Sequence, residues 1–241
     1  MPFYRRLPIK SLMNIRDLGG FGVPGGVTKF GVFIRSEVPS MFTPADFEFL
    51  KNYGLKSVID FRSENECAEN PDILSCENWV SYYNLPIFDD MAAKGISTEK
   101  IKEFTWSEHY IRLIEYRKDW INDVISTIEK AEGCLLYHCA TGKDRTGLIT
   151  MAILGLCGVA EEDIIADYSV SCIYLKSYYE RMLKEGKIKS LDDPFLSTAP
   201  ENMAYLINYI KSEYGDIPSY LNSCGISESS MNSIRNRFIQ K

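Results

Sequence analysis

The chain has 241 residues, of which 45% are hydrophobic and 25% charged, values that are ordinary for a globular protein and sufficient for one sizeable core. A net charge of −6 and a pI of about 5.1 argue against a nucleic-acid-binding protein, which needs a basic surface. No stretch is long and apolar enough to cross a membrane, so we expect one domain over residues 1–241 with no membrane span.

The first half of the chain predicts short strands and one clear helix. Residues 1–30 are rich in glycine turn signals. A helix is expected from Thr43, its cap, through Pro44 to about Tyr53, where Gly54 ends it. Residues 89–98 are interpreted as a loop. The strands expected in this half are 32–34, 57–61 and 80–85.

The second half predicts mainly helices. The longest helical signal runs over 107–132, with Ile121, Val124, Ile125 and Ile128 at helical spacing. A short apolar run behind Gly133 is typical of a buried strand. Further helices are expected from Arg145, ending at Gly158, and over 161–184, 200–211 and 227–239. This order favours an α/β fold with a mostly parallel central sheet flanked by helices and a helical C-terminal part.

The segment between the buried strand and the next helix, 138–147, reads HCATGKDRTG. Among the seven cysteines, only Cys139 has an arginine six positions later, Arg145. A loop of that length can curl around one tetrahedral anion, and the following helix directs its N-terminus at the same place. Small residues allow backbone N–H groups to converge on the anion. The expected phosphate-binding residues are Ala140, Thr141, Gly142, Lys143, Asp144 and Arg145.

The same loop predicts nucleophilic chemistry at Cys139. A nearby arginine and a helix N-terminus lower a thiol pKa, so we expect a thiolate at neutral pH. Arg145 offers a planar fork to two phosphate oxygens. The Thr146 hydroxyl is placed to assist the sulfur as a leaving group, and His138 is interpreted as fixing the loop geometry.

The motif resembles the phosphate-binding loop of cysteine-dependent phosphatases, in particular the bacterial and fungal tyrosine-phosphatase-like branch with a Lys-Asp pair, HCxxGKDRTG. Three further segments, 14–20, 58–66 and 215–221, are similar to motifs of that family. The resemblance implies a cysteine-phosphatase-like fold without a metal or other cofactor. It also implies a substrate that is a phosphotyrosine protein or a phosphoinositide, with inorganic phosphate or sulfate able to occupy the loop.

The reaction also needs a general acid to protonate the leaving oxygen. Asp144, inside the loop, and Asp89, which follows a predicted strand, are equally supported as this acid. Asp90 is a third, less favoured candidate. Residues 89–106 are polar and contain a glycine, and they are interpreted as a possible lid.

Other residues have structural interpretations. Asn14, Arg16 and Asp17 are expected to brace a turn. Arg62 and Glu66 are interpreted as an ion pair, and His109 as lying on an exposed helix face. Lys143 is left open between contact with a second phosphate and a solvated charge. A zinc site at Cys134, His138 and Cys139 ranks low, because the paired ligand spacing is missing.

The sequence thus predicts a metal-independent phosphomonoester hydrolase working through a phosphocysteine, which the resemblance makes a protein-tyrosine phosphatase, with a dual-specificity or a phosphoinositide phosphatase left open. Two alternatives are a phosphatase-like module that only binds phosphorylated partners and a rhodanese-type sulfurtransferase. The number of cysteines is odd and they are scattered along the chain, which favours reduced thiols and a reducing compartment. Residues 1–6 lack the apolar run of a secretory signal, and together these features favour a cytoplasmic location. A specialised, signal-independent export route would leave no trace in such a pattern.

Overall fold

The computed structural model describes residues 5–87 and 105–241. Its main sheet has the strand order β1-β4-β7-β5-β6. The four strands β4, β7, β5 and β6 are parallel, and the two-residue β1 pairs antiparallel with β4 at one edge. The strands are β1 (Arg16–Asp17), β4 (Phe33–Ser36), β5 (Leu55–Asp60), β6 (Ser81–Asn84) and β7 (Cys134–His138). The expected α/β fold with a mostly parallel sheet is confirmed.

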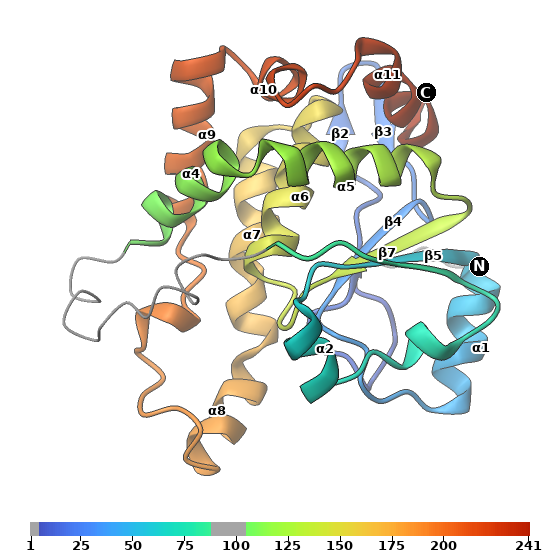
Figure 1. Cartoon of the computed structure of the whole chain (residues 1–241), viewed down its shortest axis with the longest axis vertical. Coiled ribbons are helices and arrows are strands. Elements are labelled where there is room, and N and C mark those ends of the chain that lie inside the picture. Colours follow the sequence, from blue (N-terminus) through green and yellow to red (C-terminus); the bar gives the residue numbers. More distant parts are fainter. Residues whose placement is uncertain (1–4, 88–104) are drawn as a thin grey trace.

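Helices cover both faces of this sheet (Figure 1). The helices are α1 (Pro44–Tyr53), α2 (Glu64–Glu69), α4 (Trp106–Tyr116), α5 (Lys118–Lys130), α6 (Asp144–Leu156), α7 (Glu161–Tyr174), α8 (Lys176–Lys184), α9 (Pro200–Tyr214), α10 (Ile217–Ser223) and α11 (Glu228–Phe238), with 3-10 turns η1 (Ile73–Cys76) and η3 (Pro194–Leu196). A second, three-stranded sheet joins β2 (Gly22–Val23) and β3 (Gly26–Thr28) to β8 (Ile239–Gln240).

The central strand β7 divides two hydrophobic cores because successive side chains of a strand point to opposite faces. Leu135 and Tyr137 join the larger core with α4, α5, α6 and α9 to α11. Cys134 and Leu136 join the smaller core with α1 and η1. Every residue of β7 is buried, which explains why the strand has a continuous apolar sequence rather than an alternating one.

The expected first helix is confirmed together with both of its ends. Thr43 and Asp46 form a reciprocal capping box at the start of α1. Gly54 ends the helix in the left-handed conformation, with φ of 93°, which a side chain would disfavour.

The single helix expected over 107–132 is wrong, because the chain leaves helical geometry at Arg117 (φ −124°, ψ 41°). The buried stripe of α4 ends at Leu113 and Ile114. The next positions on that face would be Arg117 and Lys118, so a new helix starts instead and buries a fresh stripe from Trp120.

The helix expected over 161–184 is likewise two helices, α7 and α8, which meet at Leu175 (φ −84°, ψ −2°). The break is slight, since the buried positions Tyr168, Ser171, Leu175 and Tyr179 keep helical spacing across it. The helix α2 and the short helix α10 were not expected. No helix among the described residues has the length and apolarity needed to cross a membrane.

Candidate active site

The loop 138–147 lies where the pattern predicts, between the carboxyl end of β7 and the start of α6, at the edge of the parallel sheet where α/β folds bind ligands. The helix begins at Asp144, one residue before the expected start. Gly142 turns the loop with a φ of +68°. The N-terminus of α6, a 13-residue helix that is buried over most of its length, therefore faces the interior of the loop.

The carbonyl groups of residues 139–142 all accept hydrogen bonds on the outer side of the loop. Cys139 O accepts from His138 Nδ1 at 3.1 Å, and Ala140 O accepts from the Val38 N–H at 3.2 Å. Asn14 Nδ2 donates to Thr141 O at 2.9 Å and to Gly142 O at 3.2 Å. In a trans peptide the next N–H points opposite to the carbonyl. The N–H groups of residues 140–143 consequently face the opposite side, inside the loop, as an anion cradle requires.

A buried cationic network stands behind this cradle. Arg35 donates to Gly142 O at 2.7 Å and to Asp167 at 2.7 Å, while Arg16 binds Asp167 at 2.8 Å and Asn14 Oδ1 at 2.7 Å. Burial alone would raise the pKa of Asp167, but Arg16 and Arg35 outweigh burial and lower the pKa to about 2. Asn14 and Arg16 therefore brace the phosphate loop itself, beyond the turn expected from the sequence.

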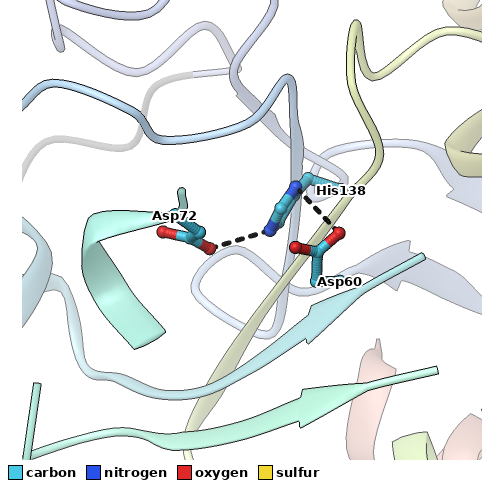
Figure 2. A group of neighbouring side chains, drawn as sticks. All are labelled: Asp60, Asp72 and His138. Carbon is cyan, nitrogen blue, oxygen red and sulfur yellow. Dashed lines mark hydrogen bonds and ion pairs between the residues drawn. The ribbon is translucent and has the colours of Figure 1, made fainter. Parts of the chain in front are cut away.

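His138 also lies behind the loop, between two carboxylates (Figure 2). Its Nε2 is 2.9 Å from Asp72 Oδ2, and its Nδ1 is 3.8 Å from Asp60 Oδ1. Burial would lower the pKa of His138, but these carboxylates outweigh burial and raise it. Three such ligand atoms within 4.8 Å resemble a metal site. Asp60, however, is already neutralised by Arg62 at 2.7 Å, so the cluster is explained as an ionic support for the loop.

Cys139 is buried at the base of the cradle, with 2% of its surface exposed. Burial alone would raise the pKa of its thiol. The charge of Arg145 and the interaction with Thr146 outweigh burial and hold the pKa below its ordinary value. Thr146 Oγ1 is buried and has no other hydrogen-bond partner among the described residues. The surroundings of the sulfur therefore favour a thiolate.

Arg145 is oriented by Glu66, a residue whose role the sequence analysis missed. Nη2 and Nη1 of Arg145 donate to the two carboxylate oxygens of Glu66 at 2.6 and 2.8 Å, and Nη1 also donates to Phe61 O at 3.2 Å. A guanidinium has five N–H donors. Within the part of the chain that the structure describes, these contacts use three and leave one on Nη2 beside the one on Nε. That remaining pair forms a fork for two phosphate oxygens.

The ion pair expected between Arg62 and Glu66 is wrong. Arg62 turns back onto Asp60 at the end of its own strand. Glu66 is the third residue of α2 and accepts from the Ser63 N–H in a capping box. The cap fixes the carboxylate at the helix N-terminus, where it meets Arg145 instead.

Asp144, a candidate general acid, lies beside the thiol in the first turn of α6, and its side chain is 20% exposed. Its Oδ1 accepts from the Tyr110 hydroxyl at 2.5 Å, and its Oδ2 lies 3.5 Å from Lys143 Nζ. The other candidates, Asp89 and Asp90, and nearly all of the suggested lid 89–106, lie outside the described residues.

One of the two alternatives left open for Lys143, and the exposed position expected for His109, do not hold. Lys143 is not a solvated charge, because its side chain is 3% exposed, its ammonium donates to Phe195 O, and it lies 4.7 Å from the centre of the Trp106 ring. His109 is 7% exposed rather than on an open face. Helix α9 packs against α4, and Trp106 covers the imidazole at 5.5 Å between ring centres. Elements distant in the sequence cover both side chains, so neighbouring residues carry no signal of their burial.

A pocket of about 690 Å³ lies between the start of α4, α8 and η3, and none of its lining residues belongs to the loop 138–147. Its walls include Trp106, Tyr179, Lys176 and Asn202. Trp106 connects the pocket to the loop through its contact with Lys143. Tyr179 is close enough to Asp144 and Cys139 for their charges to act with burial in raising its pKa. Trp106 and Tyr179 are thus the pocket walls that lie toward the loop.

An α/β protein with a Cys-x5-Arg loop at the carboxyl edge of its parallel sheet is of the cysteine-dependent phosphatase class. The sequence matches the tyrosine phosphatase family over residues 7–240, and the chain belongs to that family. It is therefore a phosphatase, which favours hydrolysis over the binding-module and sulfurtransferase alternatives.

Several named proteins are similar to this chain. A Cupriavidus necator protein provisionally named as a tyrosine-protein phosphatase is 27% identical over 226 residues, covering 89% of this chain and 82% of its own. A tyrosine-protein phosphatase of Nostoc commune is 26% identical over 230 residues (86% and 74%). The triple specificity protein phosphatase PtpB of Mycobacterium tuberculosis is 28% identical over 126 residues (46% of each). A solved structure of P. aeruginosa TpbA in complex with pTyr covers 92% of this chain and 100% of its own at 13% identity with a TM-score of 0.42; the family assignment does not depend on it.

Proposed function

We propose that this phosphatase hydrolyses phosphotyrosine in proteins through a phosphocysteine formed on Cys139. The observation that supports this proposal is the convergence on one loop of a thiol with lowered pKa, inward backbone N–H groups and the free fork of Arg145. The cradle binds the phosphate dianion, and the fork of Arg145 binds two of its oxygens. These contacts strengthen as charge develops during transfer.

In the first step the Cys139 sulfur bonds to phosphorus while the bond from phosphorus to the tyrosine oxygen breaks. We propose Asp144 as the acid that gives its proton to the departing oxygen, because its carboxyl is partly exposed beside the loop and, unlike that of Glu66, is not held by Arg145. In the second step Asp144 takes a proton from water, the water oxygen bonds to phosphorus, and the thiolate leaves with help from Thr146. Phosphate and the starting enzyme result.

Phosphotyrosine is favoured as substrate by the aromatic walls of the neighbouring pocket, Trp106 and Tyr179, which suit a planar ring. Two of the relatives carry the name tyrosine-protein phosphatase, and the name of PtpB assigns that protein three specificities. Phosphoserine, phosphothreonine and phosphoinositides are therefore the comparison substrates for this chain.

The decisive experiment measures phosphate release with chelator present from a phosphotyrosine peptide, the same peptide with phosphothreonine, and a phosphoinositide. The wild-type enzyme is expected to turn over the first fastest, and Cys139→Ser to be inactive. Full activity of Cys139→Ser would sink the mechanism. Asp144→Asn and Asp89→Asn, assayed side by side, decide which carboxyl is the acid.

A further inference from the structure

The side chain of Tyr110 reaches the candidate acid from a different helix. Tyr110 lies on α4, is fully buried, and donates its hydroxyl proton to Asp144 Oδ1 at 2.5 Å. Its hydroxyl oxygen is 2.8 Å from that of Tyr168 on α7. A phenol has one proton, and Tyr110 gives its proton to Asp144. Tyr168 must therefore be the donor in the second contact, and the hydrogen bonds run in one direction, from Tyr168 through Tyr110 to Asp144.

The two tyrosines are held rigidly against the start of α6. Tyr168 packs on Gly147, where a β-carbon would lie 3.2 Å from the Tyr168 ring. The rings of Tyr110 and Tyr168 meet edge to face with centres 6.1 Å apart. Burial, with the negative charge of Asp144, raises the pKa of Tyr110 well above its ordinary value, so the phenol keeps its proton at neutral pH.

We propose that Tyr110 is a positioning residue for the reaction, which fixes Asp144 so that Oδ2 is the oxygen that delivers the proton. The inference rests on the proposed function of Asp144 as the acid. A protonated carboxyl has one hydroxyl oxygen and one carbonyl oxygen. Because Tyr110 donates to Oδ1, Oδ1 takes the carbonyl role and the acidic proton resides on Oδ2.

Oδ2 also becomes the oxygen with the stronger negative charge after the proton has passed to the leaving group. Lys143 Nζ, 3.5 Å from Oδ2, faces that charge. The same ammonium also donates to Phe195 O and lies against the Trp106 ring, so Oδ2 keeps a lone pair for the acidic proton. The chain of donors on Oδ1 and the restrained lysine on Oδ2 give the two carboxyl oxygens different roles before substrate arrives.

The test compares Tyr110→Phe with the wild type on two aryl phosphates that differ in their need for an acid. Phenyl phosphate releases a basic phenoxide, which needs the proton to depart. p-Nitrophenyl phosphate releases p-nitrophenoxide, which departs easily without a proton. We expect kcat/KM, which reports the steps up to departure of the aryl group, to fall roughly tenfold or more for phenyl phosphate and less than about threefold for p-nitrophenyl phosphate, since the hydrogen bond that is lost positions only the acid. In the background of Asp144→Asn, Tyr110→Phe should cost no more on either substrate.

Tyr220→Phe is the matched control, because Tyr220 is also fully buried and its hydroxyl also contacts α4, donating to Ile114 O at 2.9 Å. The Tyr220→Phe variant should hydrolyse both aryl phosphates at the rates of the wild type. Equal losses on both substrates with Tyr110→Phe, or no loss, would overturn the inference. If Tyr110→Phe does not fold, Tyr168→Phe decides: a loss confined to phenyl phosphate supports the inference, and its absence rejects it. Inactivity of Cys139→Ser together with a uniform response of Tyr110→Phe would reject the role of Tyr110 and leave the proposed nucleophile standing.

Discussion

The backbone of Gly142 lies directly against Ser36 at the end of β4, so that a β-carbon on Gly142 would be 2.2 Å from Ser36 O. This contact joins the phosphate loop to the neighbouring parallel strand. Gly142 also has a φ of +68°, which an L side chain adopts at a cost.

Gly142→Ala should therefore abolish activity and destabilise the fold by more than about 3 kcal/mol, the sum of an unfavourable φ and a backbone collision. Gly186→Ala is the control, because Gly186 has a similar φ of +70° but open space around its β-carbon. It should cost only about 1 kcal/mol and keep full activity. Urea unfolding of both variants measures the difference, and equal costs would show that the contact with Ser36 is unimportant.

Glu66→Gln should reduce kcat/KM for an aryl phosphate by roughly ten- to a hundredfold, because a charge-assisted contact of about 1.5–3 kcal/mol no longer orients Arg145. Glu64 lies in the same first turn of α2 and is exposed, so Glu64→Gln should match the wild type. Unchanged kinetics of Glu66→Gln would mean that the loop alone places the guanidinium.

Cys139 should react with iodoacetate well below the pH at which an ordinary thiol does, because the pKa of Cys139 is lowered. Cys67 is the internal comparison: it is half-buried, and burial together with Asp60 raises the pKa of its thiol to about 11. Mass spectrometry of peptides after brief labelling at pH 6.5 should find Cys139 modified and Cys67 intact, with inorganic phosphate protecting Cys139. Equal labelling of the two cysteines would contradict the thiolate.

The Asp167 network should make the fold sensitive to acid. The pKa of Asp167 is about 2 in the folded protein, against 3.8 ordinarily, so the folded state releases this proton more readily than the unfolded chain. The stabilisation is present above pH 3.8 and is lost as pH falls toward 2. Its size is about 2 kcal/mol at 1.36 kcal/mol for each pKa unit.

Measurement of unfolding free energy against pH checks this, with Asp167→Asn as the comparison. The variant should be less stable at neutral pH, because Arg16 and Arg35 lose their buried counter-charge. Its stability should also fall less steeply between pH 4 and 2. Parallel curves for the two proteins would assign the acid sensitivity to other carboxylates, such as Asp60, whose pKa is also about 2.

The amino-acid sequence by itself determined the features that depend on neighbouring residues. The cap at Thr43 and the stop at Gly54 follow from local backbone preferences. The buried run before His138, the small residues of the loop and the spacing from Cys139 to Arg145 likewise lie within a dozen positions. Such signals need no knowledge of the rest of the chain, and they were enough to predict the α/β class and the phosphate loop.

Only the tertiary structure decided which distant side chains complete the site. Glu66 meets Arg145 across 79 positions, Asn14 reaches Thr141 across 127, and Tyr110 reaches Asp144 across 34. The order of strands in the sheet and the packing of α4 and α7 near α6 determine which side chains lie next to each residue of the loop. Burial likewise turned Lys143 and His109 inward, because whether a polar side chain meets water depends on elements that the chain adds much later.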